Sequence, residues 1–70
     1  FMNMWILVET EVGPTRINTD AICAYQKPKE QPNNGESLLI YTSDNTLFDV
    51  NKNCEKIIQI LDNHFDISNL

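Results

Sequence analysis

The spacing of apolar residues changes in the second half of the chain, and this change restricts the fold more than any other feature. Residues 38–41 and 47–50 have the apolar and aromatic content of strands, and the Ser-Asp-Asn cluster at 43–45 is typical of a turn. From residue 54 onward the apolar period is about 3.6 residues. The stripe consists of Cys54, Ile57, Ile58, Leu61 and Phe65. The pattern predicts a hairpin that leads directly into a helix whose stripe packs on a sheet.

The start of this helix is marked by polar residues. Asn53 is the best candidate for the N-cap, and Asn51 is the alternative, because an asparagine side chain accepts hydrogen bonds from the first free N–H groups of a helix. Glu55 follows in the first turn, where a negative charge complements the helix dipole.

The first half of the chain contains three further strand patterns, at residues 4–11, 15–18 and 22–26. A polar loop follows at 27–36, with Asn34-Gly35 as the expected turn of a long hairpin. We predict one α+β domain over residues 1–70, with a small antiparallel sheet of four to five strands (a β-meander) and one C-terminal helix packed across a face. The predicted core consists of Ile6, Val8, Ile17, Ile22, Ile40, Leu47, Val50, Ile57, Ile58 and Leu61.

The two ends of the sequence lack these patterns. We expect Phe1 to be a cloning remnant, with Met2 or Met4 as the natural start. Residues 66–70 show no periodicity, so we expect them to be frayed.

Seventy residues are few for a stable core. A chain of this size buries only about 60% of the surface that its unfolded form exposes, so it often needs a disulfide, a metal or an oligomer as a supplement. Cys23 and Cys54 allow one bridge, but without a dense cysteine framework two reduced thiols are expected. We therefore expect self-association to supplement the small core.

The chain carries ten carboxylates against five cations, for a net charge of −5. The cations form no run, which disfavours direct binding of nucleic acid or of an anionic membrane. The acidity serves solubility, or it suits a basic partner or mimics the charge of nucleic acid. No apolar run reaches the length of a membrane span, and no signal-peptide layout is present. We expect a cytoplasmic protein, in a bacterium or in the host if phage-encoded.

Residues that carry chemistry are few and scattered. The only histidine, His64, lies at the rim of the helical stripe, and no spacing pairs it with Cys23 as a thiolate couple. Cys23, Cys54, Asp62 and His64 lack the spacing of metal ligands, and both glycines precede strands rather than a helix, unlike a phosphate loop. We predict no catalytic residue, no cofactor and no metal, and therefore no enzyme.

The chain has more large apolar residues than one small core can use. Trp5 and Leu7 form a second apolar face of the first strand, and Ile60 and His64 lie on one flank of the helix. Tyr25 adds a large amphipathic ring of the kind that anchors interfaces. We predict that Trp5, Leu7, Tyr25, Ile60 and His64 bind a partner, most simply in a homo-oligomer. An ordinary surface with scattered apolar residues is the alternative.

Several segments carry a resemblance to known families. Residues 16–22 read R-I-N-T-D-A-I, residues 38–50 read L-L-I-Y-T-S-D-N-T-L-F-D-V, and V-x-x-x-x-E-x-I begins at Val50. This layout resembles the FlbD-like small flagellar or swarming-motility proteins. The M-W-I at residues 4–6 is similar to short proteins of phages and mobile elements of low-GC bacteria.

The chain departs from the FlbD-like pattern in two places. It has a Ser-Asp-Asn turn at 43–45 where those proteins carry Asn-Gly or Asp-Gly, and its polar loop is longer. The resemblance implies a cytosolic bacterial or phage protein with a β-meander and a C-terminal helix. It transfers no catalytic residue.

These observations leave two functions open. The first is a non-enzymatic protein-binding module that self-associates, and a specific form of it is a phage or mobile-element inhibitor whose acidic surface occupies the nucleic-acid site of a host protein. The second is a small-molecule or nucleotide-binding regulatory protein with its site between subunits.

Overall fold

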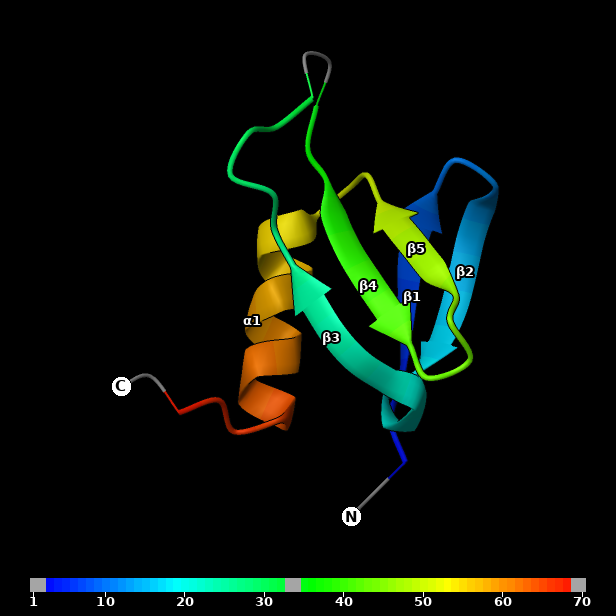
Figure 1. Cartoon of the computed structure of the whole chain (residues 1–70), viewed down its shortest axis with the longest axis vertical. Helices are drawn as coiled ribbons and strands as arrows, with labels where there is room; N and C mark the ends of the chain where they lie inside the picture. Colours follow the sequence, from blue (N-terminus) through cyan, green and yellow to red (C-terminus); the bar gives the residue numbers. More distant parts are fainter. Residues whose placement is uncertain (1–2, 33–34, 69–70) are drawn as a thin grey trace.

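The computed structural model describes residues 3–32 and 35–68. Its elements, in chain order, are β1 (Trp5–Thr10), β2 (Gly13–Asn18), the short 3-10 helix η1 (Thr19–Ala21), β3 (Ile22–Gln26), β4 (Leu38–Thr42), β5 (Leu47–Val50) and α1 (Cys54–His64). The chain is thus a small α+β protein with one C-terminal helix, as the sequence predicts (Figure 1).

The strands form two antiparallel sheets, so the single predicted sheet is not confirmed. β1 pairs with β2, and β3, β4 and β5 pair in that order. Strand pairing does not continue from β2 to β3, because η1 lies between them. The Asn18 side chain accepts a hydrogen bond from the Asp20 N–H (3.0 Å), which turns the backbone out of the ladder.

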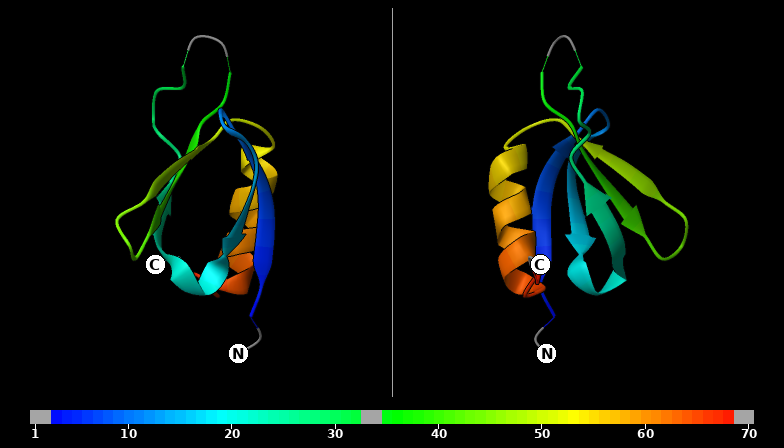
Figure 2. Two further views of the ribbon diagram at one scale, coloured as in Figure 1. Left: turned by 90° about the vertical axis from the view of Figure 1, so that its right-hand side faces the viewer. Right: turned by 60° about the vertical axis from the view of Figure 1, so that its left-hand side comes forward.

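One backbone hydrogen bond ties the two sheets together near one end. The N–H of Asn51, the residue after β5, donates to the carbonyl oxygen of Glu9 in β1 (3.0 Å). From this contact the β4–β5 hairpin and the β1–β2 hairpin diverge toward the 42–46 turn, and α1 lies along β1 (Figure 2). The core fills the space between the sheets and the helix.

The core is drawn from both sheets and from the helix. Leu47 was predicted to belong to it and does not, because its side chain is 52% exposed. Leu47 lies opposite Tyr41 on the outer face of the second sheet, whereas Phe48 and Val50 lie opposite Ile40 and Leu38. Ile22 and Ile58 are half-buried at the margin. The buried apolar residues are Ile6, Val8, Ile17, Leu38, Ile40, Val50, Cys54, Ile57 and Leu61.

The start of α1 is held by a residue that is distant in sequence. Asn53 is the N-cap residue by position, but it adopts a left-handed backbone (φ 56°) and its side chain makes no capping hydrogen bond. The Glu36 carboxylate instead accepts the hydrogen bond of the Cys54 N–H (2.9 Å). A negative charge is favourable there because the free N–H groups of a helix start carry partial positive charge. The predicted capping role of the Asn53 side chain is therefore wrong.

Some predictions fall on residues that the structure does not describe. Phe1 and Met2, Asn34 of the expected Asn34-Gly35 turn, and residues 69–70 lie outside the described residues. Within the expected frayed end, the N–H of Ile67 donates to the carbonyl oxygen of Asp62 (3.1 Å).

Candidate functional site

The outer face of the β1–β2 hairpin presents the largest exposed aromatic side chain. Side chains alternate along β1, so Ile6 and Val8 point into the core while Trp5 and Leu7 point away from it. Trp5 is 61% exposed and Leu7 is 53% exposed. Two of the predicted partner-binding residues therefore lie side by side on one exposed face.

Polar neighbours frame these two side chains. Residues directly opposite each other in an antiparallel pair share a face. Asn18 is opposite Trp5, Arg16 is opposite Leu7, and Glu9 follows Leu7 on the same side of β1. We call this set the β1 outer face: Trp5, Leu7, Glu9, Arg16 and Asn18.

Tyr25 makes its main contacts within its own chain. Its ring packs against the core, stacks on Phe65 with 6.1 Å between ring centroids, and donates its hydroxyl to the Asp62 carboxylate (2.7 Å). Burial, followed by this hydrogen bond and the Asp62 charge, raises the pKa of Tyr25 to about 12. The side chain therefore connects α1 to β3. Only the part of the ring that stays accessible is free for the predicted contact with a partner.

His64 and Ile60 lie on the flank of α1 that faces the start of β1. The Thr19 hydroxyl donates to the carbonyl oxygen of Met4 (2.8 Å), and its oxygen lies 3.2 Å from Nε2 of His64. Ile60, one helical turn earlier, is 38% exposed. The structure thus places this flank beside the residue that precedes Trp5, while His64 itself is engaged by Thr19.

The thiols occupy separate environments. Cys23 is exposed and donates to the carbonyl oxygen of Tyr41 (3.5 Å), whereas Cys54 is buried and donates to that of Val50 (3.3 Å). Burial, with the nearby Glu36 carboxylate, raises the pKa of the Cys54 thiol to about 11. In the described part of the chain, no group of three or more His, Cys, Asp or Glu side chains is arranged to hold a metal ion.

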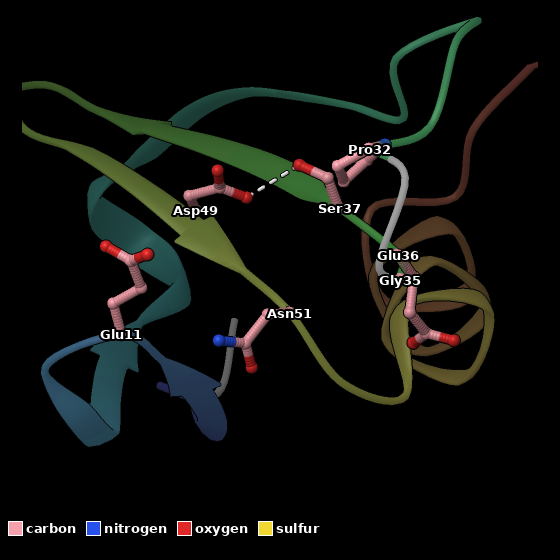
Figure 3. A pocket seen from close by; sticks show the side chains of 7 residues that line it. All are labelled: Glu11, Pro32, Gly35, Glu36, Ser37, Asp49 and Asn51. Carbon is pink, nitrogen blue, oxygen red and sulfur yellow. Dashed lines mark hydrogen bonds between the residues drawn. The ribbon is translucent and has the colours of Figure 1, made fainter.

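A second feature, an acidic hollow, was not predicted from the sequence. It has a volume of about 340 Å³ and is lined by Glu11, Glu36 and Asp49, of which Glu36 points toward the start of α1 (Figure 3). Asp49 accepts a hydrogen bond from the Ser37 hydroxyl (2.6 Å). The pKa of Glu36 is lowered, chiefly because its carboxylate accepts the Cys54 N–H. The three carboxylates of the hollow come from three separate segments of the chain. The only related signal in the sequence is therefore the negative net charge.

Comparison with known proteins adds no assignment. No protein-family model, no curated protein and no solved structure matches this chain. Among the described residues, none of the helices has the length and apolar character needed to cross a membrane.

Proposed function

We propose that this chain is a non-enzymatic protein-binding module that self-associates through the β1 outer face. The observation that carries the proposal is the pair of large apolar side chains, Trp5 and Leu7, held exposed on a regular strand. Exposed aromatic residues on a rigid element bind partners at low entropic cost, because strand pairing already fixes their positions. Burying them in a second copy supplements a core that is small for an independent domain.

A second copy suits this face because the face carries both a positive and a negative side chain, so two identical faces can pair opposite charges. Arg16 and Glu9 lie on two sides of Leu7, one across the hairpin and one along the strand. In a two-fold symmetric contact whose axis runs near Leu7 and between Arg16 and Glu9, Arg16 of each copy faces Glu9 of the other. The net charge of −5 opposes association of two copies, and such pairing offsets that repulsion locally.

The inhibitor form of the proposal draws support from the acidic hollow. Glu11, Glu36 and Asp49 line it, as expected of a surface that takes a basic partner or occupies a nucleic-acid site. The FlbD-like and phage-protein resemblances stay predictions and supply the setting, a bacterial or phage cytosolic protein.

The alternative, a small-molecule or nucleotide regulator, gains less from the geometry. The acidic hollow is lined by three carboxylates, and a phosphate placed among them would meet repulsion instead of the N–H groups or cations that phosphates require. We therefore place protein binding first.

The test is the molar mass in solution, measured by light scattering over a range of concentrations, for the wild type and three variants. Trp5→Ser and Leu7→Ser remove the apolar contact. Val12→Ser is the matched control, since Val12 is an apolar residue that is 98% exposed at the hairpin turn and lies off the β1 outer face.

The proposal predicts a mass that rises toward a dimer for the wild type and for Val12→Ser, and a monomer for Trp5→Ser and Leu7→Ser over the same range. Equal behaviour of all four proteins would show that this face is not the contact.

A further inference from the structure

The outermost strand of the three-stranded sheet, β5, pairs with another strand along only one of its two edges. β4 covers one edge of β5, and the register places Ile40 opposite Phe48 and Leu38 opposite Val50. The Thr42 N–H donates to the Thr46 carbonyl oxygen (3.0 Å), so Thr42 and Thr46 form a hydrogen-bonded pair. Hydrogen-bonded and non-hydrogen-bonded pairs alternate along an antiparallel ladder, so the two pairs named above, at even spacing from Thr42 and Thr46, are hydrogen-bonded as well.

Backbone groups alternate between the two edges of a strand, so Leu47 and Asp49 direct their N–H and C=O groups away from β4. Asn51, the next residue of this set, bonds with Glu9 of β1. Beyond this contact the two hairpins diverge (Figure 2). Among the described residues, no hydrogen bond reaches the backbone groups of Leu47 or Asp49 on this edge.

Two other edge strands, β2 and β3, are protected from further pairing. β2 carries Pro14, opposite Glu9, at a position where the missing N–H would face outward. β3 is flanked by α1 through the Tyr25–Asp62 hydrogen bond and the Lys27–Glu55 ion pair. β5, with the sequence Leu-Phe-Asp-Val, contains neither the lysine nor the proline that keeps strand edges from pairing.

Two hollows lie between β5 and the β1–β2 hairpin, and Phe48 borders both of them. One, of about 190 Å³, is bordered by Glu11, Val12, Leu47 and Asp49. The other, of about 280 Å³, reaches from Phe48 to Asp44 and to Trp5, Arg16 and Asn18 of the β1 outer face. Together they form a groove along β5, with the half-buried Phe48 ring accessible from both sides.

The charges along the groove indicate what occupies it. Glu11, Asp44 and Asp49 border it against one cation, Arg16, and Glu11 and Asp49 also line the acidic hollow. We propose that an extended segment of a partner protein, rich in basic side chains, adds to the free edge of β5 as a further strand. Backbone hydrogen bonds to Leu47 and Asp49 supply affinity, and the carboxylates select the basic side chains.

A second copy of this chain fits the edge less well. Pairing β5 with β5 across a two-fold axis brings the Asp49 and Glu11 carboxylates of both copies together, and each copy has a net charge of −5. Opposite charge on the incoming strand avoids this repulsion.

The test titrates the ¹⁵N-labelled full chain with a short capped peptide of alternating lysine and valine. A peptide with glutamate in place of lysine is the control. The proposal predicts chemical-shift changes and slowed hydrogen exchange at the amides of Leu47 and Asp49, with the lysine peptide bound more tightly than the glutamate peptide.

Two substitutions at one position separate backbone pairing from side-chain contact. Leu47→Pro removes the outward N–H without touching the ladder to β4, and Leu47→Ala keeps this N–H. Leu47→Pro is expected to weaken binding by about tenfold relative to Leu47→Ala, the scale of one lost hydrogen bond. Asp49→Lys, which leaves the backbone intact, is expected to favour the glutamate peptide.

The proposal is wrong if the lysine peptide does not bind, if both peptides bind equally, or if the shifts lie away from β5. Protection of the Leu47 and Asp49 amides that grows with protein concentration in the absence of peptide would assign the edge to a second copy, which also overturns it. Leu7 lines neither hollow, so Leu7→Ser is expected to abolish self-association and to keep every residue that borders the groove. Binding of the lysine peptide to this variant therefore tests the edge of β5 separately from the dimer.

Discussion

Nε2 of His64 lies 3.2 Å from the hydroxyl oxygen of Thr19, within hydrogen-bond distance. The direction of this hydrogen bond follows from the single hydrogen that the Thr19 hydroxyl can donate. The Thr19 hydroxyl already donates to the carbonyl oxygen of Met4 at 2.8 Å, so toward His64 its oxygen can only accept. Thr19 is fully buried, and this contact ties the end of α1 to η1 and to the start of β1.

The first prediction is that neutral His64 carries its proton on Nε2. Long-range ¹H–¹⁵N correlation spectra at mildly alkaline pH are expected to show this tautomer in the wild type. In Thr19→Val, which removes the acceptor with little change in volume, the preference is expected to weaken and the free energy of unfolding to fall by about 1 kcal/mol. A wild-type His64 protonated on Nδ1 would contradict the assigned direction.

The second prediction concerns stability at alkaline pH. The pKa of Tyr25, about 12, lies above its ordinary value of 10.0, so the folded state holds the phenol proton more tightly than the unfolded state. The resulting stability is complete below pH 10.0 and is lost as the pH rises toward about 12. Tyr25→Phe is expected to lose about 1 kcal/mol at neutral pH and to show a flatter decline over the alkaline window.

Urea unfolding at a series of pH values measures both effects. Tyr41→Phe is the matched control, because Tyr41 lies on the outer face of the second sheet opposite Leu47. A decline in Tyr25→Phe as steep as in the wild type would contradict the role of the Tyr25–Asp62 hydrogen bond.

The third prediction is selective reactivity of the thiols. Cys23 is exposed, whereas Cys54 is buried with its pKa raised to about 11, so Cys54 stays a protonated, inaccessible thiol. Iodoacetamide applied to the native protein is expected to modify Cys23 first, and Cys54 only after denaturation. Mass spectrometry of the alkylated peptides reads out the order, with Cys23→Ser expected to stay unmodified when folded. Equal rates at the two thiols would show that the core opens around Cys54.

The fourth prediction concerns the charges on the β1 outer face. Arg16→Glu and Glu9→Arg are each expected to weaken self-association at low salt, by roughly 0.2–1 kcal/mol for each exposed ion pair, and the double swap is expected to restore it. The dimer dissociation constant, measured by sedimentation equilibrium, reports the effect. High salt is expected to reduce the differences. A double swap as weak as the single variants would contradict the pairing of Arg16 with Glu9.

Local patterns of the sequence predicted the helix because its stripe is a property of neighbouring residues. Ile57 and Leu61 repeat at one turn and are buried as predicted. Leu47 was placed in the core together with Val50, although two residues three positions apart lie on opposite faces of a strand. The strand period, applied strictly, points Phe48 and Val50 inward and Leu47 outward, as observed.

Contacts between residues that are distant in sequence could not be predicted from local patterns. The division into two sheets depends on η1, a three-residue segment too short to carry a periodic pattern of its own. Glu36 reaches the start of α1 across 18 residues, and the acidic hollow joins Glu11 and Asp49, which are 38 residues apart. Such contacts arise from tertiary folding, and Glu11 and Glu36 lie in a turn and a loop, which carry no periodic signal.

The fluorescence of Trp5 tests the central claim most directly, because Trp5 is the only tryptophan in the chain and lies on the β1 outer face. The emission spectrum is recorded as the wild-type protein is diluted, with Leu7→Ser as a monomeric reference. Self-association through this face predicts emission at shorter wavelength at high concentration and a shift to longer wavelength on dilution, at the concentrations where the mass falls from dimer to monomer. A spectrum typical of a solvent-exposed indole at every concentration would contradict it.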